Sequence, residues 1–242
     1  MSPFSLEGRT ALVTGANTGI GQAIAVAMGR AGAHVIAAGR SSCAETVEMI
    51  ESAEEMRLDL ADPMAARGAF GDRDVDILVN NAGIIRRADS VDFSEGDWDD
   101  VMGVNLKALF FTCQAFARAR LARGAEGRIV NIASLLSFQG GIRVPSYTAS
   151  KHGVAGLTKI LANEWAAEGI GVNAIAPGYI ATANTEALRA DAERNAAILE
   201  RIPAGRWGEP GDIAGTAVFL ASPAARYLHG AVINVDGGWL AR

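Results

Sequence analysis

The stretch from Arg9 to Gly21 reads RTALVTGANTGIG, and it decides the fold. Its first six residues predict a short buried strand, and a helical pattern begins at residue 19. The turn between them holds Gly15, Gly19 and Gly21 in the spacing G-x-x-x-G-x-G. Gly15 permits a tight turn, and the other two glycines let a diphosphate approach the first N–H groups of the helix. The stretch therefore predicts a dinucleotide site; the alternative is a plain strand-to-helix connection that uses glycine for packing.

Strand-like and helix-like runs alternate along the rest of the chain. Further strands are expected at 34–38, at 56–60 where the third one ends, and at 75–79, 128–133, 172–176 and 231–235. Helices are expected at 19–32, 44–55, 98–123 (one or two), 147–168, 186–200 and 212–221. This alternation indicates an α/β fold, a doubly wound Rossmann-type domain of about seven parallel strands with helices on both faces. No repeat or linker-like stretch divides the chain, so residues 1–242 are expected to form a single domain.

Composition excludes several classes of function. The formal net charge is −5 and no basic run is present, which argues against a nucleic-acid partner. Two cysteines and three scattered histidines lack the spacing of metal ligands, so no metal is expected. The chain starts without the pattern of a signal peptide and has no uninterrupted apolar run of about 18 residues, so a cytoplasmic protein without a membrane span is expected.

The residues after the second strand bear on the choice of cofactor. A carboxylate there would accept hydrogen bonds from the adenosine ribose and repel a 2′-phosphate. Here Arg40 follows the strand, with Ser41 and Ser42 beside it, and Arg40 can pair with a phosphate. NADP(H) is therefore favoured, with NAD(H) possible; the alternative is that Arg40 is a solvated surface residue.

Tyr147 and Lys151 stand one helical turn apart on the expected helix 147–168. At this spacing they share a face, and a nearby ammonium group is expected to lower the pKa of the tyrosine towards the working pH. The phenolate could then accept a proton from an alcohol. Ser134 follows the fifth strand directly, where doubly wound folds bind their ligands.

Read together, these residues resemble the short-chain dehydrogenase/reductase family over essentially the whole chain. The matching elements are the turn 14–21, Asp59, the run 80–83, Asn105, Ser134, Tyr147, Lys151, Pro177 and Gly178. The resemblance implies an NAD(P)-dependent enzyme in which Ser134 polarises the substrate oxygen and Tyr147 transfers the proton. It further implies that Lys151 tunes Tyr147 and binds the nicotinamide ribose, while Asn105 holds a water in the proton relay.

The same resemblance implies a set of residues around the cofactor. Asp59 and Leu60 would border the adenine, and Thr182 would meet the nicotinamide end. The whole expected set is Gly15, Asn17, Thr18, Gly19, Ile20, Arg40, Asp59, Leu60, Asn81, Ala82, Gly83, Tyr147, Lys151, Pro177, Gly178, Ile180 and Thr182.

A narrower resemblance concerns the substrate. The stretches 84–87, 137–147, 201–208 and 235–242 look like the deoxy-gluconate dehydrogenases within that family. Their sugar-acid substrates carry a carboxylate, for which arginine is a natural bidentate partner. Arg86 and Arg143 are candidates, and Gln139 could bind a hydroxyl; the alternative for each is a structural or subunit-interface role.

The expected activity is the interconversion of a secondary alcohol and a ketone on a small deoxy sugar acid. A lid over the substrate is expected near residues 179–208, and the family resemblance implies a homotetramer. One alternative is another short-chain reductase, such as a 3-oxoacyl carrier-protein reductase. A second alternative is a non-catalytic dinucleotide-binding protein, against which the set of Ser134, Tyr147 and Lys151 argues.

Overall fold

A computed structural model describes residues 2–70 and 73–241; residues 1, 71, 72 and 242 of the expected domain lie outside this part. In the described part, one sheet of seven parallel strands has the order β3-β2-β1-β4-β5-β6-β7. The strands are β1 (Thr10–Thr14), β2 (His34–Gly39), β3 (Ala53–Arg57), β4 (Ile77–Asn80), β5 (Gly127–Ile132), β6 (Ile170–Pro177) and β7 (Val232–Val235). The order reverses between β1 and β4, and doubly wound folds bind ligands at such a switch point.

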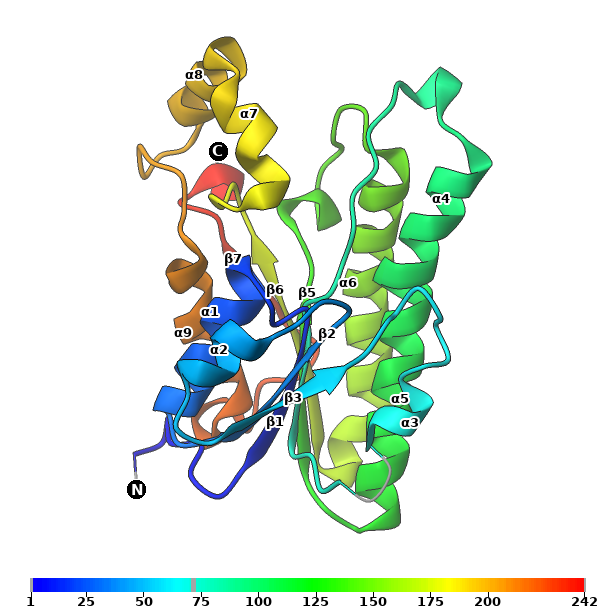
Figure 1. The fold of residues 1–242 in the computed structure, drawn as a ribbon, viewed down its shortest axis with the longest axis vertical. Helices are drawn as coiled ribbons and strands as arrows, with labels where there is room; N and C mark the ends of the chain where they lie inside the picture. Colours follow the sequence, from blue (N-terminus) through cyan, green and yellow to red (C-terminus); the bar gives the residue numbers. More distant parts are fainter. Residues whose placement is uncertain (1, 71–72, 242) are drawn as a thin grey trace.

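Helices cover both faces of this sheet (Figure 1). One face is covered by α1 (Gly19–Arg30), α2 (Ala44–Glu48) and α9 (Pro210–Ala221). The other is covered by α3 (Arg67–Phe70), α5 (Leu109–Ala122) and α6 (Pro145–Trp165), with α4 (Glu95–Met102) packed against α6. Two short helices, α7 (Glu186–Ala190) and α8 (Ala192–Arg201), stand beyond the carboxyl ends of the strands, at the top of Figure 1. The doubly wound α/β expectation is confirmed.

The core lies in two layers because the central strands are buried on both faces. Val13, Val35 and Val79 face α1 and α9, whereas Leu12, Leu78 and Ile129 face α5 and α6. All eight residues of β6 are buried. Near-continuous apolar strands are expected in a parallel sheet that helices cover on both sides.

The helix expected at 44–55 is wrong beyond residue 48. α2 ends at Glu48, and residues 53–57 form β3, whose Ala53 pairs with Val35 of β2. Pairing with a buried neighbouring strand overrides the acidic, helix-like composition of this segment, because an edge strand tolerates exposed charged side chains. The third strand accordingly ends at Arg57, earlier than expected.

The expected helix at 98–123 consists of three pieces. Between α4 and α5, residues Gly103–Ala108 form a π-helical segment, η2. The expected helix at 186–200 is also divided, since Asp191 ends α7 and its side chain caps α8 by accepting a 3.1 Å hydrogen bond from the Arg194 N–H. No helix in the described residues is long and apolar enough to cross a membrane.

Candidate active site

The glycine turn leaves the start of α1 open. Gly15 and Gly19 have φ of 64° and 57°, a left-handed conformation that favours glycine. Thr18 is the N-cap of α1, and its side chain makes no capping hydrogen bond. The first N–H groups of the helix therefore remain available, and together with the helix dipole they suit a phosphate.

Asn81 holds this turn against β4. Its Nδ2 donates hydrogen bonds to the backbone oxygens of Thr14 (3.0 Å) and Gly15 (3.1 Å). A Cβ on Gly21 would come within 2.1 Å of the Gly15 oxygen, so no side chain fits there. Packing therefore requires glycine at position 21, and the same turn leaves the first N–H groups of α1 uncapped.

A cavity of about 450 Å³ lies beside the turn, at the carboxyl ends of β1, β2 and β4. Of the residues expected around the cofactor, it is lined by Gly15, Asn17, Arg40, Asp59, Leu60, Ala82 and Gly83. Arg40 is exposed at its rim, and no carboxylate of the described residues lies within 4.0 Å of its guanidinium. The cavity therefore offers an unpaired cation beyond the second strand.

The other residues expected around the cofactor lie outside that lining. A Cβ on Gly19 would stand 3.5 Å from the Thr182 methyl group, so the chain after β6 closes over the glycine turn. Gly178 lines a second cavity, whereas Ile180 is buried and bridges to Gly208. Thr18, Ile20 and Pro177 are not among the residues that line either of these two cavities.

Ser134 and Tyr147 meet at the carboxyl end of β5. Ser134 is buried just after the strand, and its Oγ accepts a 3.1 Å hydrogen bond from the Leu136 N–H. Burial raises the pKa of Tyr147 above its ordinary value, while a hydrogen bond with Ser134 and the charge of Arg87 act in the opposite direction. The expected lowering of this pKa is therefore wrong for the protein alone, because removal of the phenol from water outweighs the neighbouring groups.

Lys151 is buried one turn further along α6. Its Nζ lies 5.5 Å from the centre of the Tyr147 ring and donates a 2.6 Å hydrogen bond to the Ile132 oxygen. Burial lowers the pKa of Lys151 to about 8. The amine thus sits close to the tyrosine, with part of its charge lost at slightly alkaline pH.

Asn105 lies on the π-helical segment η2. Its Nδ2 donates to the Ile84 oxygen at 2.9 Å, and its Oδ1 accepts from the Ile84 N–H at 2.8 Å. The same Nδ2 approaches Ser150 Oγ at 3.4 Å, and that hydroxyl donates to the backbone carbonyl oxygen of Tyr147. The widened turn of a π-helix, a frequent feature of functional sites, brings Asn105 to α6.

A second cavity of about 370 Å³ contains Ser134 and Tyr147. Four arginines line it: Arg87, Arg143, Arg194 and Arg201. No aspartate or glutamate is among its described lining residues, although the whole chain carries a net charge of −5. The cavity beside the serine and tyrosine is therefore electropositive.

Two of the three residues expected to bind substrate line this cavity, and one does not. Arg86 lines the first cavity, beside the glycine turn, and pairs at 3.1 Å with both Asp97 and Asp100. Arg143 lines the second cavity with a φ of 63° and pairs with Asp89 at 3.1 Å. Gln139 also lines it, and its Oε1 accepts a 3.2 Å hydrogen bond from the Trp239 indole.

Several residues of this cavity were not predicted individually from the sequence, among them Arg87, Tyr179, Arg194 and Arg201, although the last three lie within the lid expected at 179–208. Arg194 and Arg201 are seven positions apart on a polar helix, a pattern that reads equally well as a solvated face. Their spacing was a weak signal for a shared binding site, because residues seven positions apart lie on one side of a helix.

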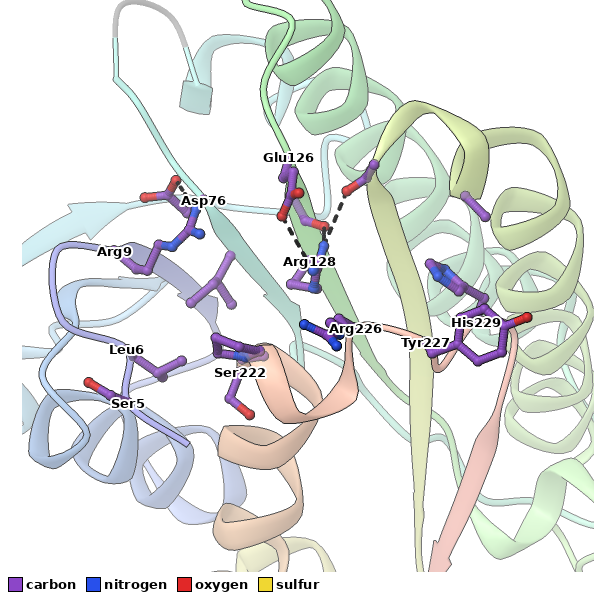
Figure 2. A pocket seen from close by; sticks show the side chains of 16 residues that line it. Ser5, Leu6, Arg9, Asp76, Glu126, Arg128, Ser222, Arg226, Tyr227 and His229 are labelled. Carbon is purple, nitrogen blue, oxygen red and sulfur yellow. Dashed lines mark hydrogen bonds and ion pairs between the residues drawn. The ribbon is translucent and has the colours of Figure 1, made fainter. Parts of the chain in front are cut away.

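A third cavity, of about 690 Å³, lies at the opposite edge of the sheet (Figure 2). It is lined by residues at or just before the amino ends of the strands, among them Arg9, Asp76, Arg128 and Gly169. Its charges are largely paired within the wall: Arg9 with Asp76 at 3.2 Å, and Arg128 with Glu126 at 3.5 Å (Figure 2). This cavity contains none of the residues expected to be catalytic, so the site lies at the carboxyl edge.

The fold and the two adjoining cavities define a dinucleotide-dependent oxidoreductase. Residues 15–240 match a family model described as enoyl-(acyl carrier protein) reductase. The chain belongs to this family, that of the short-chain dehydrogenases/reductases, and the resemblance seen in the sequence is confirmed.

Relatives and solved structures cover the whole chain. It is 53% identical to the 2-dehydro-3-deoxy-D-gluconate 5-dehydrogenase of Escherichia coli, over 100% of this chain and 99% of that one. It is 57% identical to the enzyme of that name from Bacillus subtilis, over 99% and 97%. A crystal structure of a candidate 2-deoxy-D-gluconate 3-dehydrogenase from Agrobacterium tumefaciens, with bound NADP, is 72% identical with a TM-score of 0.99, over 100% of both chains.

Proposed function

We propose that this chain interconverts a secondary alcohol and a ketone on a small deoxy sugar acid, with NADP(H) as the hydride carrier. The observation that carries the proposal is the second cavity, where Ser134 and Tyr147 face four arginines and no described carboxylate. A sugar acid matches this cavity because its carboxylate complements the arginines and its hydroxyls complement the polar groups. The relatives named above act, by their names, on deoxy sugar acids.

Each residue of the site has its own role in the proposed reaction. Ser134 polarises the substrate oxygen, and Tyr147 takes the hydroxyl proton in the direction of oxidation. Arg87 and the hydroxyl of Ser134 favour the phenolate against the cost of burial. Lys151 adds a positive charge next to the tyrosine and binds the nicotinamide ribose, and Asn105 holds a water that connects the tyrosine to solvent. When bound, the nicotinamide accepts or donates the hydride at its C4 atom.

The residues of the first cavity fit a dinucleotide. The uncapped start of α1 suits the diphosphate, and Asp59 and Leu60 border the adenine end. Arg40 pairs with the 2′-phosphate, which favours NADP(H) and still permits NAD(H). Gly15, Asn17, Thr18, Gly19, Ile20 and Asn81 to Gly83 form the cradle, and Pro177, Gly178, Ile180 and Thr182 close it beside the nicotinamide.

The whole chain acts as a single domain in the cytoplasm. Residues 179–208, which include α7 and α8, serve as a lid over the substrate. We further propose a homotetramer, supported by an apolar groove between η2, α5 and α6. Leu106, Phe110, Leu157 and Ile160 line this groove, and Ile160 is 47% exposed. A second copy of the chain would cover this surface.

The test is a steady-state assay of the purified protein with NADP⁺ and with NAD⁺. The substrates are 2-deoxy-D-gluconate, 2-dehydro-3-deoxy-D-gluconate, a neutral sugar alcohol and a 3-hydroxybutyryl thioester. The proposal predicts that one of the deoxy sugar acids has the highest kcat/KM, with NADP⁺ preferred. A highest kcat/KM for the thioester would support a 3-oxoacyl reductase instead, and no turnover of any of them would contradict the proposal.

A further inference from the structure

Two of the four arginines in the substrate cavity come from one face of α8. Arg194 and Arg201 are seven residues apart, close to two full turns, so their side chains leave the helix on the same side. Ile198, between them in sequence, is buried in a cluster with Leu135 and Ile202, which fixes α8 against the rest of the site. Both arginines are exposed at the cavity wall and can reach a ligand from water.

Arg201 is held in place by an aromatic platform. Its guanidinium lies 4.1 Å from the centre of the Trp239 ring. Trp239 in turn donates to Gln139 and packs against Tyr179 with ring centres 4.6 Å apart. A guanidinium stacked on an indole keeps its edge N–H groups free for an anion, so Arg201 is oriented before any ligand arrives.

Tyr179 connects the two arginines. Burial raises its pKa, whereas the charges of Arg194 and Arg201 both lower it, so both guanidinium groups act on one phenol. Tyr179 lines the same cavity as Tyr147. Arg194 and Arg201 line this cavity too, so two positive charges and a phenol hydroxyl border the same space.

The other arginines near the site already have partners. Arg86 pairs with Asp97 and Asp100, Arg143 pairs with Asp89, and Arg87 donates a 2.9 Å hydrogen bond to the Asn184 oxygen. Among the described residues, no carboxylate lies within 4.0 Å of the guanidinium of Arg194 or Arg201. Arg194 and Arg201 can therefore accept a carboxylate without breaking an existing ion pair. Among the described residues Arg87 has no ion pair either, but the Asn184 oxygen holds one of its N–H groups.

We propose that Arg194 and Arg201 bind the carboxylate of the sugar acid, with the Tyr179 hydroxyl as a third donor. This inference rests on the proposed function and names the group that selects the substrate. The carboxylate then lies under α8 while the reacting alcohol lies at Ser134 and Tyr147. A substrate without the carboxylate therefore loses affinity for this cavity.

The test compares Arg194→Gln, Arg201→Gln and the conservative variant Arg201→Lys with wild type, using 2-deoxy-D-gluconate and its neutral amide. Loss of a charge-assisted contact predicts a KM for the acid that rises about tenfold to a hundredfold in each glutamine variant. The kcat should change much less, since the groups that transfer the proton are untouched. Arg201→Lys should retain an intermediate KM, because lysine keeps the charge but not the planar fork. The KM for the amide should be the same in all four proteins.

Arg118→Gln is the matched control, because it removes the same charge from an exposed position of α5 outside the described cavity walls. Its KM for the acid should equal that of wild type. Equal losses for acid and amide, or an unchanged KM in both glutamine variants, would overturn the carboxylate assignment while leaving the proposed activity intact. A wild type that turns over neither compound, nor the other deoxy sugar acid, would overturn both.

Discussion

The Nζ of Lys151 lies 5.5 Å from the centre of the Tyr147 ring, one turn along α6. This spacing joins the two residues that the proposed chemistry needs, yet burial raises the pKa of the tyrosine and lowers that of the lysine. Without cofactor, the fold therefore keeps the Tyr147 phenol protonated at neutral pH, while Lys151 retains most of its positive charge below pH 8. Positive charge from the bound oxidised nicotinamide would favour the phenolate at the moment it is needed.

Tyr147→Phe should abolish most of the turnover and leave the affinity for NADP(H) unchanged. The change removes one hydroxyl and almost no packing volume, and general acid–base catalysis contributes roughly 10²–10⁴-fold. Steady-state kinetics measures kcat, and fluorescence titration measures the dissociation constant of NADPH. A variant that keeps more than about a tenth of wild-type kcat would rule out Tyr147 as the proton carrier.

Lys151 should make the stability of the protein depend on pH. Its folded pKa of about 8 lies below its ordinary value, so between pH 8 and about 10.5 the unfolded chain binds more protons at this residue. The unfolding free energy of wild type should therefore rise over this window relative to Lys151→Met, by on the order of 3 kcal/mol. Below pH 8 the difference should be constant. Urea unfolding at pH 7, 8.5 and 10 measures this, and a difference that falls with rising pH would be inconsistent with the buried amine.

Arg40→Ala should weaken NADP(H) binding and leave NAD(H) binding nearly unchanged. A bidentate pair with the 2′-phosphate is worth roughly 1.5–3 kcal/mol, or about tenfold to a hundredfold in affinity. Arg40→Asp should reverse the preference, because a carboxylate repels the phosphate and accepts the ribose hydroxyls. The dissociation constants of NADP(H) and NAD(H), measured for wild type and both variants, test this prediction. Parallel losses for both cofactors would mean that Arg40 stacks on the adenine instead.

A second copy of the chain should cover the apolar groove of η2, α5 and α6 in solution. Light scattering of the wild type is expected to give about four times the chain mass of 25.2 kDa. Ile160→Asp should lower that mass, because a buried unpaired carboxylate at an interface is costly. A wild-type mass of 25.2 kDa at micromolar concentration would refute the homotetramer.

Local sequence patterns predicted those parts of the fold that local forces decide. The buried runs of β1, β2, β5 and β6 match the expected strands closely, since apolar strands covered on both faces leave a plain pattern. β3 was missed in part because its exposed residues form a strand only through their partner β2. The π-helical turn at Asn105 was not expected either, because its widened geometry leaves no periodicity to read.

The candidate site, too, could be predicted from the sequence only in part. Ser134, Tyr147 and Lys151 have fixed spacing and fixed places at the strand ends, and the structure brings them together. The direction of the Tyr147 pKa depends on burial, which its neighbours in sequence do not reveal. Arg194 and Arg201 reach the cavity only because α8 packs beyond the carboxyl ends of the strands (Figure 1), so their sequence shows an ordinary polar helix.

The proposed reaction oxidises a secondary alcohol of a deoxy sugar acid, with NADP⁺ as the hydride acceptor. The most direct measurement incubates the protein with NADP⁺ and 2-deoxy-D-gluconate, follows NADPH by absorbance, and determines the product by mass spectrometry. One keto acid is expected, two hydrogen atoms lighter than the substrate, formed in equal amount to NADPH and not formed by Tyr147→Phe. NADPH formation without that product, or an equal yield from Tyr147→Phe, would contradict the proposed reaction.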